Sequence, residues 1–106
     1  ISYRVDEWDI DFQKYLINLK LKGKGVIWVG DLNVAHKEID IYHHDDKFLK
    51  YPGFSEKERN SLSKFLENGW VDTYRIRNNE IRCFSYWQSI GNYRKNNKGW
   101  RLDYFI

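Results

Sequence analysis

The sequence predicts an α/β fold, in which helices pack against a sheet. An amphipathic helix over residues 8–21 is followed by two glycines and by a short apolar strand over 26–29. A second helix over 56–68 begins with a capping pattern. Two further stretches, 83–88 and 100–106, are rich in the aromatic and β-branched residues typical of strands.

The first helix is predicted from apolar residues spaced along one helical face, namely Trp8, Phe12, Tyr15, Leu16 and Leu19. Asp6 or Asp9 is expected to cap its start, and Gly23 with Gly25 is expected to end it. The stretch from Val26 to Val29 is short and shows no alternation with polar residues. We therefore expect a strand that is buried on both faces.

The second half of the chain begins with a long polar loop over residues 40–54. Ser55 and Glu58 are spaced as a capping box, and the helix that they begin is expected to end at Gly69. The segment WVDTY is expected to be a short strand or a turn. The segment RIRNNEIR is expected to be a connection built on the turn residues Asn78 and Asn79.

Composition favours a packed domain and is compatible with a polyanionic partner. Of the 106 residues, 42% are hydrophobic and 18% aromatic, and the net charge is +3. The aromatic residues either fill a core or offer stacking surfaces for bases or sugars. Between residues 75 and 101 only Glu80 is acidic, against the basic residues Arg75, Arg77, Arg82, Arg94, Lys95, Lys98 and Arg101.

The location and extent of the protein are also constrained by the sequence. The single cysteine, Cys83, cannot form an internal disulfide, and no apolar run approaches the roughly 20 residues that span a bilayer. We expect a soluble intracellular protein without membrane contact. The final stretch, WRLDYFI, ends within a strand pattern, so we expect residues 1–106 to be part of a single domain truncated at both ends.

The motif GDLN places a carboxylate, Asp31, and a carboxamide, Asn33, at the end of the apolar strand. The pair is suited either to a metal ion beside a phosphate or to a turn that closes the strand. On these four residues alone the turn is favoured. Asp103 lies within a strand pattern, where a buried carboxylate usually orients a histidine or pairs with an arginine.

Three histidines, His36, His43 and His44, match no metal-binding spacing. We interpret them as solvated loop residues.

Four segments taken together, GDLNVAHKEID, GFSEKER, FSYW and GWRLDYF, closely resemble the exonuclease III-type apurinic/apyrimidinic (AP) endonucleases. These nucleases belong to the endonuclease/exonuclease/phosphatase superfamily. The segments occur in the family's order and extend over essentially the whole chain. GDLN marks the superfamily, whereas GWRLDYF is specific to the AP endonuclease branch.

The resemblance implies a fold and an activity. The fold is a four-layer α/β sandwich of the deoxyribonuclease-I type, with two mixed sheets flanked by helices. The activity is Mg²⁺-dependent hydrolysis, with Mn²⁺ as an alternative metal, of the phosphodiester 5′ to an abasic site in double-stranded DNA. A 3′-exonuclease or 3′-phosphodiesterase activity accompanies it in the family. The full-length protein is expected to be a monomer of the nucleus, or of mitochondria or plastids.

The resemblance also implies roles for individual residues. Asp31 activates the attacking water or holds the metal, Asn33 contacts the metal and the scissile phosphate, and Asp103 orients a histidine that lies beyond Ile106. The family's other metal ligands and its catalytic tyrosine are expected to precede this segment. The abasic sugar is expected to bind Tyr86, Trp100 and Leu102, and DNA is expected to contact Arg94, Lys95, Asn96, Asn97 and Arg101.

The loop from Ile41 to Tyr51 departs from the Asn- and Lys-rich version that is usual in the family. Two other functions stay open at this stage. One is a different phosphodiesterase of the superfamily, acting on phosphoinositides or sphingolipids, against which the basic segment argues. The other is a DNA-binding fragment without catalytic activity.

Overall fold

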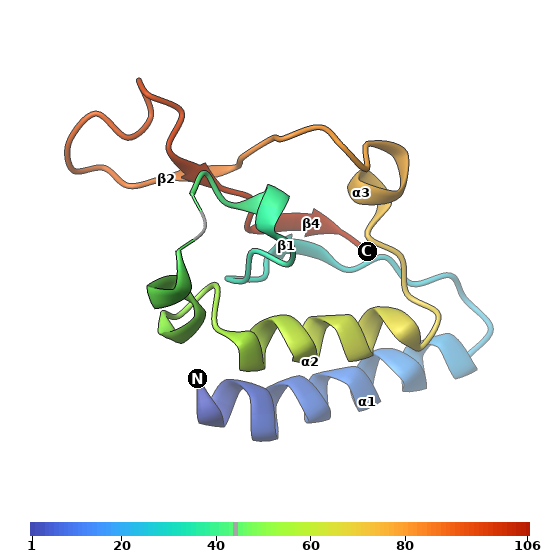
Figure 1. Cartoon of the computed structure of the whole chain (residues 1–106). Helices are drawn as coiled ribbons and strands as arrows, with labels where there is room; N and C mark the ends of the chain where they lie inside the picture. Colours follow the sequence, from blue (N-terminus) through green and yellow to red (C-terminus); the bar gives the residue numbers. More distant parts are fainter. Residues whose placement is uncertain (44) are drawn as a thin grey trace.

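Two long helices form one layer of the molecule (Figure 1). The computed structural model describes residues 1–43 and 45–106. Helix α1 (Asp9–Leu21) and helix α2 (Glu56–Glu67) lie side by side, and a hydrogen bond of 2.6 Å joins the Ser61 hydroxyl to Asp9. Both helices contribute buried residues to one hydrophobic cluster, among them Leu16, Leu62 and Phe65.

The start of α1 differs from the prediction. Helical backbone already begins at residue 2 and passes through a π-helical turn, Arg4–Trp8, so the predicted cap at Asp6 or Asp9 is wrong. Asp9 lies inside the helix and pairs with the Arg4 guanidinium at 2.6 Å. The predicted end of the helix is confirmed, because Gly23 follows the last turn with a φ of 83°.

Strand β1 (Val29–Asp31) pairs antiparallel with strand β4 (Asp103–Phe105). The expectation that residues 26–29 are buried on both faces is wrong. Val26 and Trp28 pack against the helices, whereas Ile27 is 74% and Val29 53% exposed. The helices cover one face of this sheet, and in the described part of the chain the other face is open.

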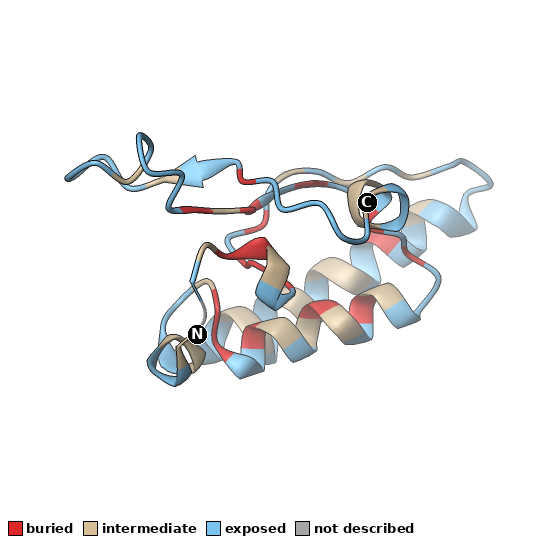
Figure 2. Ribbon diagram, turned by 45° about the horizontal axis from the view of Figure 1, so that its top comes forward, coloured by how far each residue is buried: buried red, intermediate tan, exposed pale blue. Residues whose placement is uncertain are grey.

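The segment between β1 and α2 contains two short 3₁₀ helices, η2 (Glu38–Asp40) and η3 (Asp46–Lys50). The predicted capping box at the start of α2 is confirmed. The Ser55 hydroxyl accepts a hydrogen bond from the Glu58 N–H, and the Glu58 carboxylate accepts one from the Ser55 N–H, both of 3.3 Å. Figure 2 shows buried positions along α2 and along the strands above it.

The last third of the chain holds a short helix and a hairpin. The segment expected to be a strand or turn instead leads into helix α3 (Thr73–Arg77), with Asp72 as its N-cap. Strand β2 (Tyr86–Trp87) pairs antiparallel with β3 (Gly99–Trp100), so the predicted strand over 83–88 is shorter than expected. A Cβ on Gly99 would lie 2.5 Å from the Trp87 indole nitrogen, so this close pairing requires glycine.

A buried ionic network connects the second half of the fold. The Arg101 guanidinium is 4% exposed and bonds the carboxylates of Asp40, at 2.7 Å, and Asp72, at 2.5 Å. The Arg75 guanidinium also bonds Asp40. The network therefore ties η2 and α3 to the segment between β3 and β4. Within the described residues no helix combines the length and the apolar character needed to cross a membrane.

Candidate active site

A cleft with a volume of about 680 Å³ lies between the end of β1, the hairpin and the loop before α2. It brings together five of the residues that the sequence selected. They come from segments far apart in the chain, and they are Asp31, Asn33, Tyr86, Trp100 and Leu102.

Asp31 and Asn33 are held by a local turn at the end of β1. The Asn33 N–H donates a hydrogen bond of 2.8 Å to the Asp31 Oδ1, and Asn33 has a φ of 52°, which asparagine tolerates well. The turn that was the alternative interpretation is therefore present. A carboxylate offers two oxygens, so this turn leaves Asp31 able to bind a cation as well.

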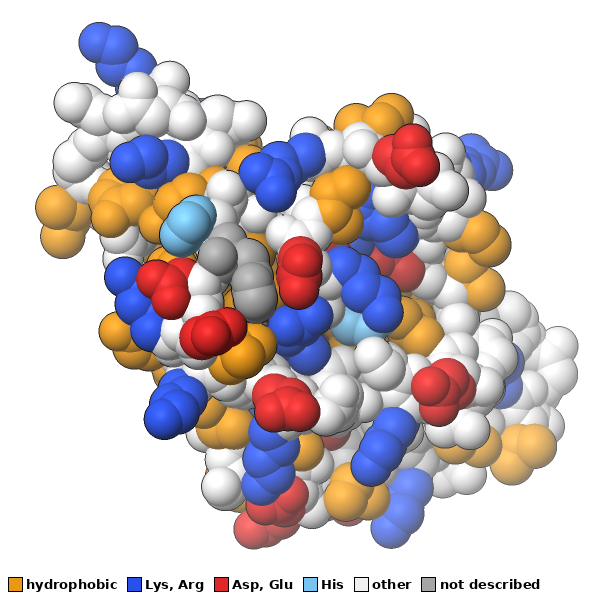
Figure 3. All heavy atoms as spheres, viewed as in Figure 1, with side chains coloured by type: hydrophobic (Ala, Val, Ile, Leu, Met, Phe, Trp, Pro, Cys, Tyr) orange, Lys and Arg blue, Asp and Glu red, His pale blue; other side chains and the backbone are white. Residues whose placement is uncertain are grey.

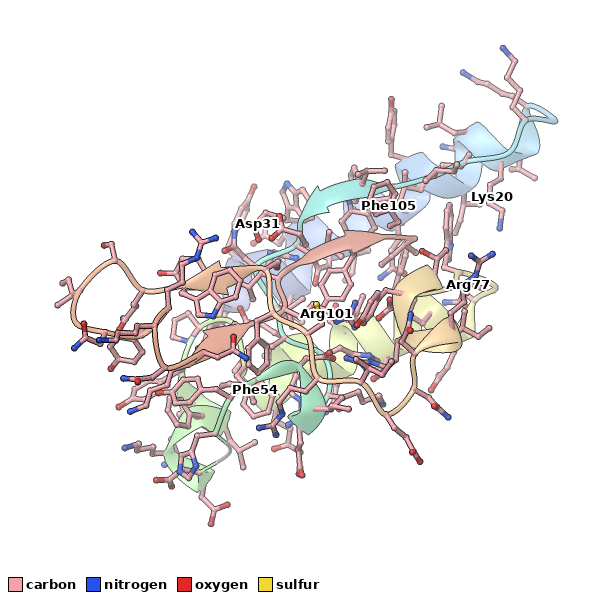
Figure 4. The ribbon with its side chains drawn as sticks, turned by 90° about the horizontal axis from the view of Figure 1, so that it is seen from above. Lys20, Asp31, Phe54, Arg77, Arg101 and Phe105 are labelled. Atoms are coloured by element: carbon pink, nitrogen blue, oxygen red, sulfur yellow. The ribbon has the colours of Figure 1, made fainter. Side chains whose placement is uncertain are left out.

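Asp103 lies directly opposite Asp31 in the β1–β4 pair. Side chains that are directly opposite share one face of a sheet, so this pairing brings two negative charges together at the end of β1. The expectation that Asp103 is buried is wrong, because it lies on the open face of the sheet. Figure 4 shows Asp31 at the end of β1, beside the strand that carries Phe105.

The donor chemistry of this corner fits magnesium. Asp31 and Asn33 supply carboxylate and amide oxygens, which are the atoms that Mg²⁺ prefers, and Mg²⁺ usually binds one or two carboxylates and keeps several waters. Within residues 1–43 and 45–106, no cluster of three or more His, Cys, Asp or Glu side chains is present. The corner therefore fits a partial, mostly hydrated metal site.

One wall of the cleft is apolar. Tyr86 and Trp100 are partners across the β2–β3 pair, and Leu102 continues the wall towards Asp31. The Trp100 ring contacts the Phe54 ring edge-on, with centroids 6.3 Å apart, and Gly53 leaves room for it. Tyr86 is 45% exposed, so the wall combines a fixed indole with an accessible phenol.

The predicted DNA-contacting residues divide into two groups. Arg94, Lys95, Asn96 and Asn97 are exposed in the hairpin loop outside the cleft, and Trp87 donates a hydrogen bond of 3.1 Å to the Asn97 side chain. Arg101 is different. Its burial between two carboxylates leaves it no surface to offer DNA, so its assignment as a DNA contact is wrong (Figure 4).

The histidine prediction is wrong at one position. His36 is 6% exposed, its Nε2 lies 2.7 Å from the Ser63 hydroxyl, and burial lowers its pKa to about 4. His43 is exposed as expected, and His44 lies outside the described residues. His36 is thus a neutral structural side chain that joins the segment after β1 to helix α2.

Tyr104, which the sequence analysis did not select, positions the segment after Asn33. Its hydroxyl donates to the Val34 carbonyl at 2.5 Å and accepts from the His36 N–H at 3.2 Å. Burial raises the pKa of this phenol, so it stays protonated and keeps its donor. No local pattern distinguished it from other strand aromatics.

The sequence patterns also do not indicate that Tyr3 and Arg4 lie near the site. Together with Trp8 and Trp28 they line a second hollow of about 320 Å³, which shares Asp31 and Asn33 with the cleft. The Arg4 guanidinium donates a hydrogen bond of 2.8 Å to the Leu32 carbonyl, between the two site residues. The helix that begins near residue 2 therefore brings a phenol and a cation to the end of β1.

The chain is similar to known proteins in sequence and in structure. The model of the Endonuclease/Exonuclease/phosphatase family matches residues 1–106. The chain is 48% identical over 107 aligned residues to a DNA-(apurinic or apyrimidinic site) endonuclease of Dictyostelium discoideum, covering 100% of this chain and 29% of that protein. It is 39% identical over 107 residues to an exodeoxyribonuclease of Bacillus subtilis, covering 100% of this chain and 41% of that protein.

The structure is similar to that of an AP endonuclease from Leishmania major, with a TM-score of 0.88 and 32% identity, over 98% of this chain and 35% of that one. The predicted α/β class and the resemblance to AP endonucleases are confirmed. The chain spans about a third of the length of these relatives.

Proposed function

This chain belongs to the Endonuclease/Exonuclease/phosphatase family, and from that membership we propose that the protein containing it is a DNA repair nuclease. In this proposal it hydrolyses the phosphodiester 5′ to an abasic site in double-stranded DNA and leaves a 3′-hydroxyl. The observation that carries the proposal is the cleft itself, which is lined by Asp31 and Asn33 and by the apolar wall of Tyr86, Trp100 and Leu102.

The polar corner of the cleft supports phosphodiester hydrolysis. In the proposal Asp31 and Asn33 would hold Mg²⁺, or Mn²⁺ in its place, and such an ion would supply Lewis acidity towards a phosphate oxygen. Asp103 orients a catalytic histidine of the full-length protein. Asp31 accepts the proton of the attacking water. The Asn33 amide donates to a phosphoryl oxygen, where negative charge grows in the transition state.

The apolar wall supports selection of a sugar that lacks its base. A nucleotide that leaves the helix must fit a shaped pocket, and a sugar without a base is small enough to pack its carbon atoms against an apolar surface. Trp100 and Leu102 offer such a surface, with Tyr86 opposite Trp100 in the hairpin. The exposed side chains Arg94, Lys95, Asn96 and Asn97 are proposed to contact the backbone of the flanking duplex.

Further properties follow from the proposed substrate. The same corner can attack a 3′-terminal phosphodiester, so a 3′-exonuclease or 3′-phosphodiesterase activity is part of the proposal. The full-length protein acts as a monomer on nuclear DNA, and mitochondrial or plastid genomes offer the same lesion.

The test is the Asp31→Asn substitution in the full-length protein. The amide keeps the size but loses the charge and the basicity, so the rate of abasic-site cleavage should fall at least about 100-fold while DNA binding persists. Asp11→Asn, an exposed aspartate of α1, is the matched control and should leave the rate unchanged. If Asp31→Asn cleaves at a rate close to that of the unmodified protein, Asp31 has only a structural role in the turn. Cleavage of inositol phosphates in preference to abasic DNA would favour the lipid phosphodiesterases.

A further inference from the structure

The loop over residues 41–51 lines the cleft with aromatic rings on the side opposite β1. Tyr42, Phe48 and Tyr51 come from this loop, and Tyr93 comes from the hairpin. We call these four residues the aromatic lip. Their rings follow one another edge to face, with centroids 6.2 Å apart for Tyr93 and Tyr42, 6.5 Å for Tyr42 and Phe48, and 5.6 Å for Phe48 and Tyr51.

The aromatic lip is more accessible than core packing requires. Tyr51 is 50% exposed and Tyr42 and Tyr93 are half-buried, whereas Phe54, the ring just below them, is fully buried. Core rings are normally covered, so accessible rings lining a cleft indicate a surface that meets a ligand. Edge-to-face contacts also leave ring faces available to a flat molecule.

The lip is held in place by the backbone. The Tyr42 N–H donates to the Gly99 carbonyl at 3.0 Å, and the Arg82 guanidinium donates to the Tyr42 carbonyl at 3.1 Å. The Tyr51 N–H donates to the Phe48 carbonyl at 3.0 Å, which closes η3. Rings fixed in this way lose little conformational freedom when a ligand stacks on them.

The charges around the lip favour a base rather than a phosphate. The loop pairs Lys47 with Asp45 at 3.8 Å, and its two acids, Asp45 and Asp46, are balanced by Lys47 and Lys50. Figure 3 shows this mixture of lysine, aspartate and hydrophobic side chains around η3. A phosphate-binding surface needs an excess of cations. Base stacking needs only a ring face and tolerates every base.

The aromatic lip is continuous with the proposed abasic pocket. The Phe48 ring contacts the Trp100 ring with centroids 6.1 Å apart, so one row of rings leads from the lip to the pocket wall. We infer that the aromatic lip is a second subsite, which stacks the unpaired base of the nucleotide next to the abasic site. This inference rests on the proposed function, and it makes abasic sites beside mismatched or frayed nucleotides the preferred substrates.

The experiment measures binding of the full-length protein to three duplexes that carry a stable abasic analogue. In the first both neighbouring nucleotides are paired, in the second the 5′ neighbour is mismatched, and in the third the 3′ neighbour is mismatched. The Asp31→Asn background prevents cleavage. A fluorescent base analogue at the mismatched position reports stacking through quenching of its emission.

Tyr51→Ala and Tyr93→Ala should each weaken binding of a mismatched duplex by about 5- to 100-fold, the range expected for loss of one stacked base, and should restore the emission. Binding of the paired duplex should change less than about twofold. Tyr51→Phe keeps the ring and should keep the binding. Tyr15→Ala, an exposed aromatic of α1, is the control and should have no effect.

Equal losses of affinity for the paired and the mismatched duplexes would contradict base stacking on the aromatic lip. So would unchanged affinity for both mismatched duplexes. This outcome is distinct from failure of the proposed function, which would appear as absence of abasic-site cleavage by the unmodified protein. If the unmodified protein cleaves abasic DNA and the two tyrosine variants bind the mismatched duplexes normally, the nuclease proposal is retained and the second subsite is rejected.

Discussion

At the scale of single residues, His36 couples the site to pH. The ring is buried and lies against Ser63, and burial, with Lys37 next, lowers its pKa from 6.5 to about 4. Between these two pH values the unfolded chain binds a proton that the folded chain excludes. The free energy of unfolding therefore rises with pH through this window.

We expect the full-length protein to lose on the order of 2 to 3 kcal/mol of stability between about pH 6.5 and pH 4 through this residue alone. His36→Gln keeps a polar group beside Ser63 but does not titrate, so it should flatten this part of the pH profile. Denaturant unfolding at several pH values measures the effect. A profile that is equally steep in the variant would show that His36 is not its source.

Trp100 gives a second prediction at this scale. Trp100→Ala should reduce the preference for abasic over intact duplex roughly tenfold, because the pocket wall contacts only the flipped sugar. Affinity for intact DNA should change little, since that is expected to depend on Arg94 and Lys95 and to fall with salt. Titrations of both duplexes at several salt concentrations separate the two effects. An equal loss of affinity for both duplexes would show that Trp100 does not contribute to the proposed sugar pocket.

At the scale of elements, the ionic network around Arg101 holds the pocket together. Burial by itself would lower the pKa of Arg101, but the hydrogen bonds that its guanidinium donates to Asp72 and Asp40 raise it above its ordinary value. The pKa of Asp40 is lowered by Arg101 despite its burial. Because Trp100 and Leu102 flank Arg101 in the chain, the network also sets the position of the apolar wall.

Arg101→Met should destabilise the protein by about 3 to 5 kcal/mol, because it leaves two buried carboxylates without their common partner. Arg77→Met, on the exposed side of α3, should change stability by less than about 0.5 kcal/mol. Denaturant unfolding of both variants makes the comparison. A small loss of stability in Arg101→Met would show that water replaces the guanidinium as the hydrogen-bond donor to the two carboxylates.

Elements that depend on near neighbours were predictable from sequence, and long-range contacts were not. The capping box of Ser55 and Glu58 spans three residues and was read correctly. The bond between Arg101 and Asp40 joins residues 61 positions apart. The local pattern around Arg101 therefore does not distinguish a buried ion pair from a DNA contact. The cleft residues were predicted through the family resemblance, whereas Tyr3 and Tyr104 gained their positions only through tertiary packing.

At the scale of the whole molecule, the chain is a slab with extents of 46 × 30 × 22 Å. Its shortest dimension suits two layers packed about 10 Å apart. The open face of the β1–β4 sheet carries Ile27, Val29 and Phe105, which are 53 to 74% exposed. Trp28 is partly buried and Phe84 is buried, so these two rings are not part of this open face.

Residues 1–106 expressed alone should therefore self-associate and should not cleave abasic DNA, because an open apolar sheet face promotes association. Replacing Ile27 and Val29 by lysine should shift the fragment towards monomer in sedimentation experiments. Ile90→Lys alters an equally exposed loop residue and should not. A monomeric fragment that cleaves the strand would contradict this prediction.

The pairing of β1 with β4 also determines where the chain can change in length. Val29, Gly30 and Asp31 are matched with Phe105, Tyr104 and Asp103. One inserted or deleted residue between Trp100 and Asp103 would exchange the inward and outward side chains, moving the phenol out of the core and a carboxylate into it. The loop at 88–97 is largely exposed and has no such register. Insertions should therefore be tolerated at the tip of the hairpin and rejected a few residues later.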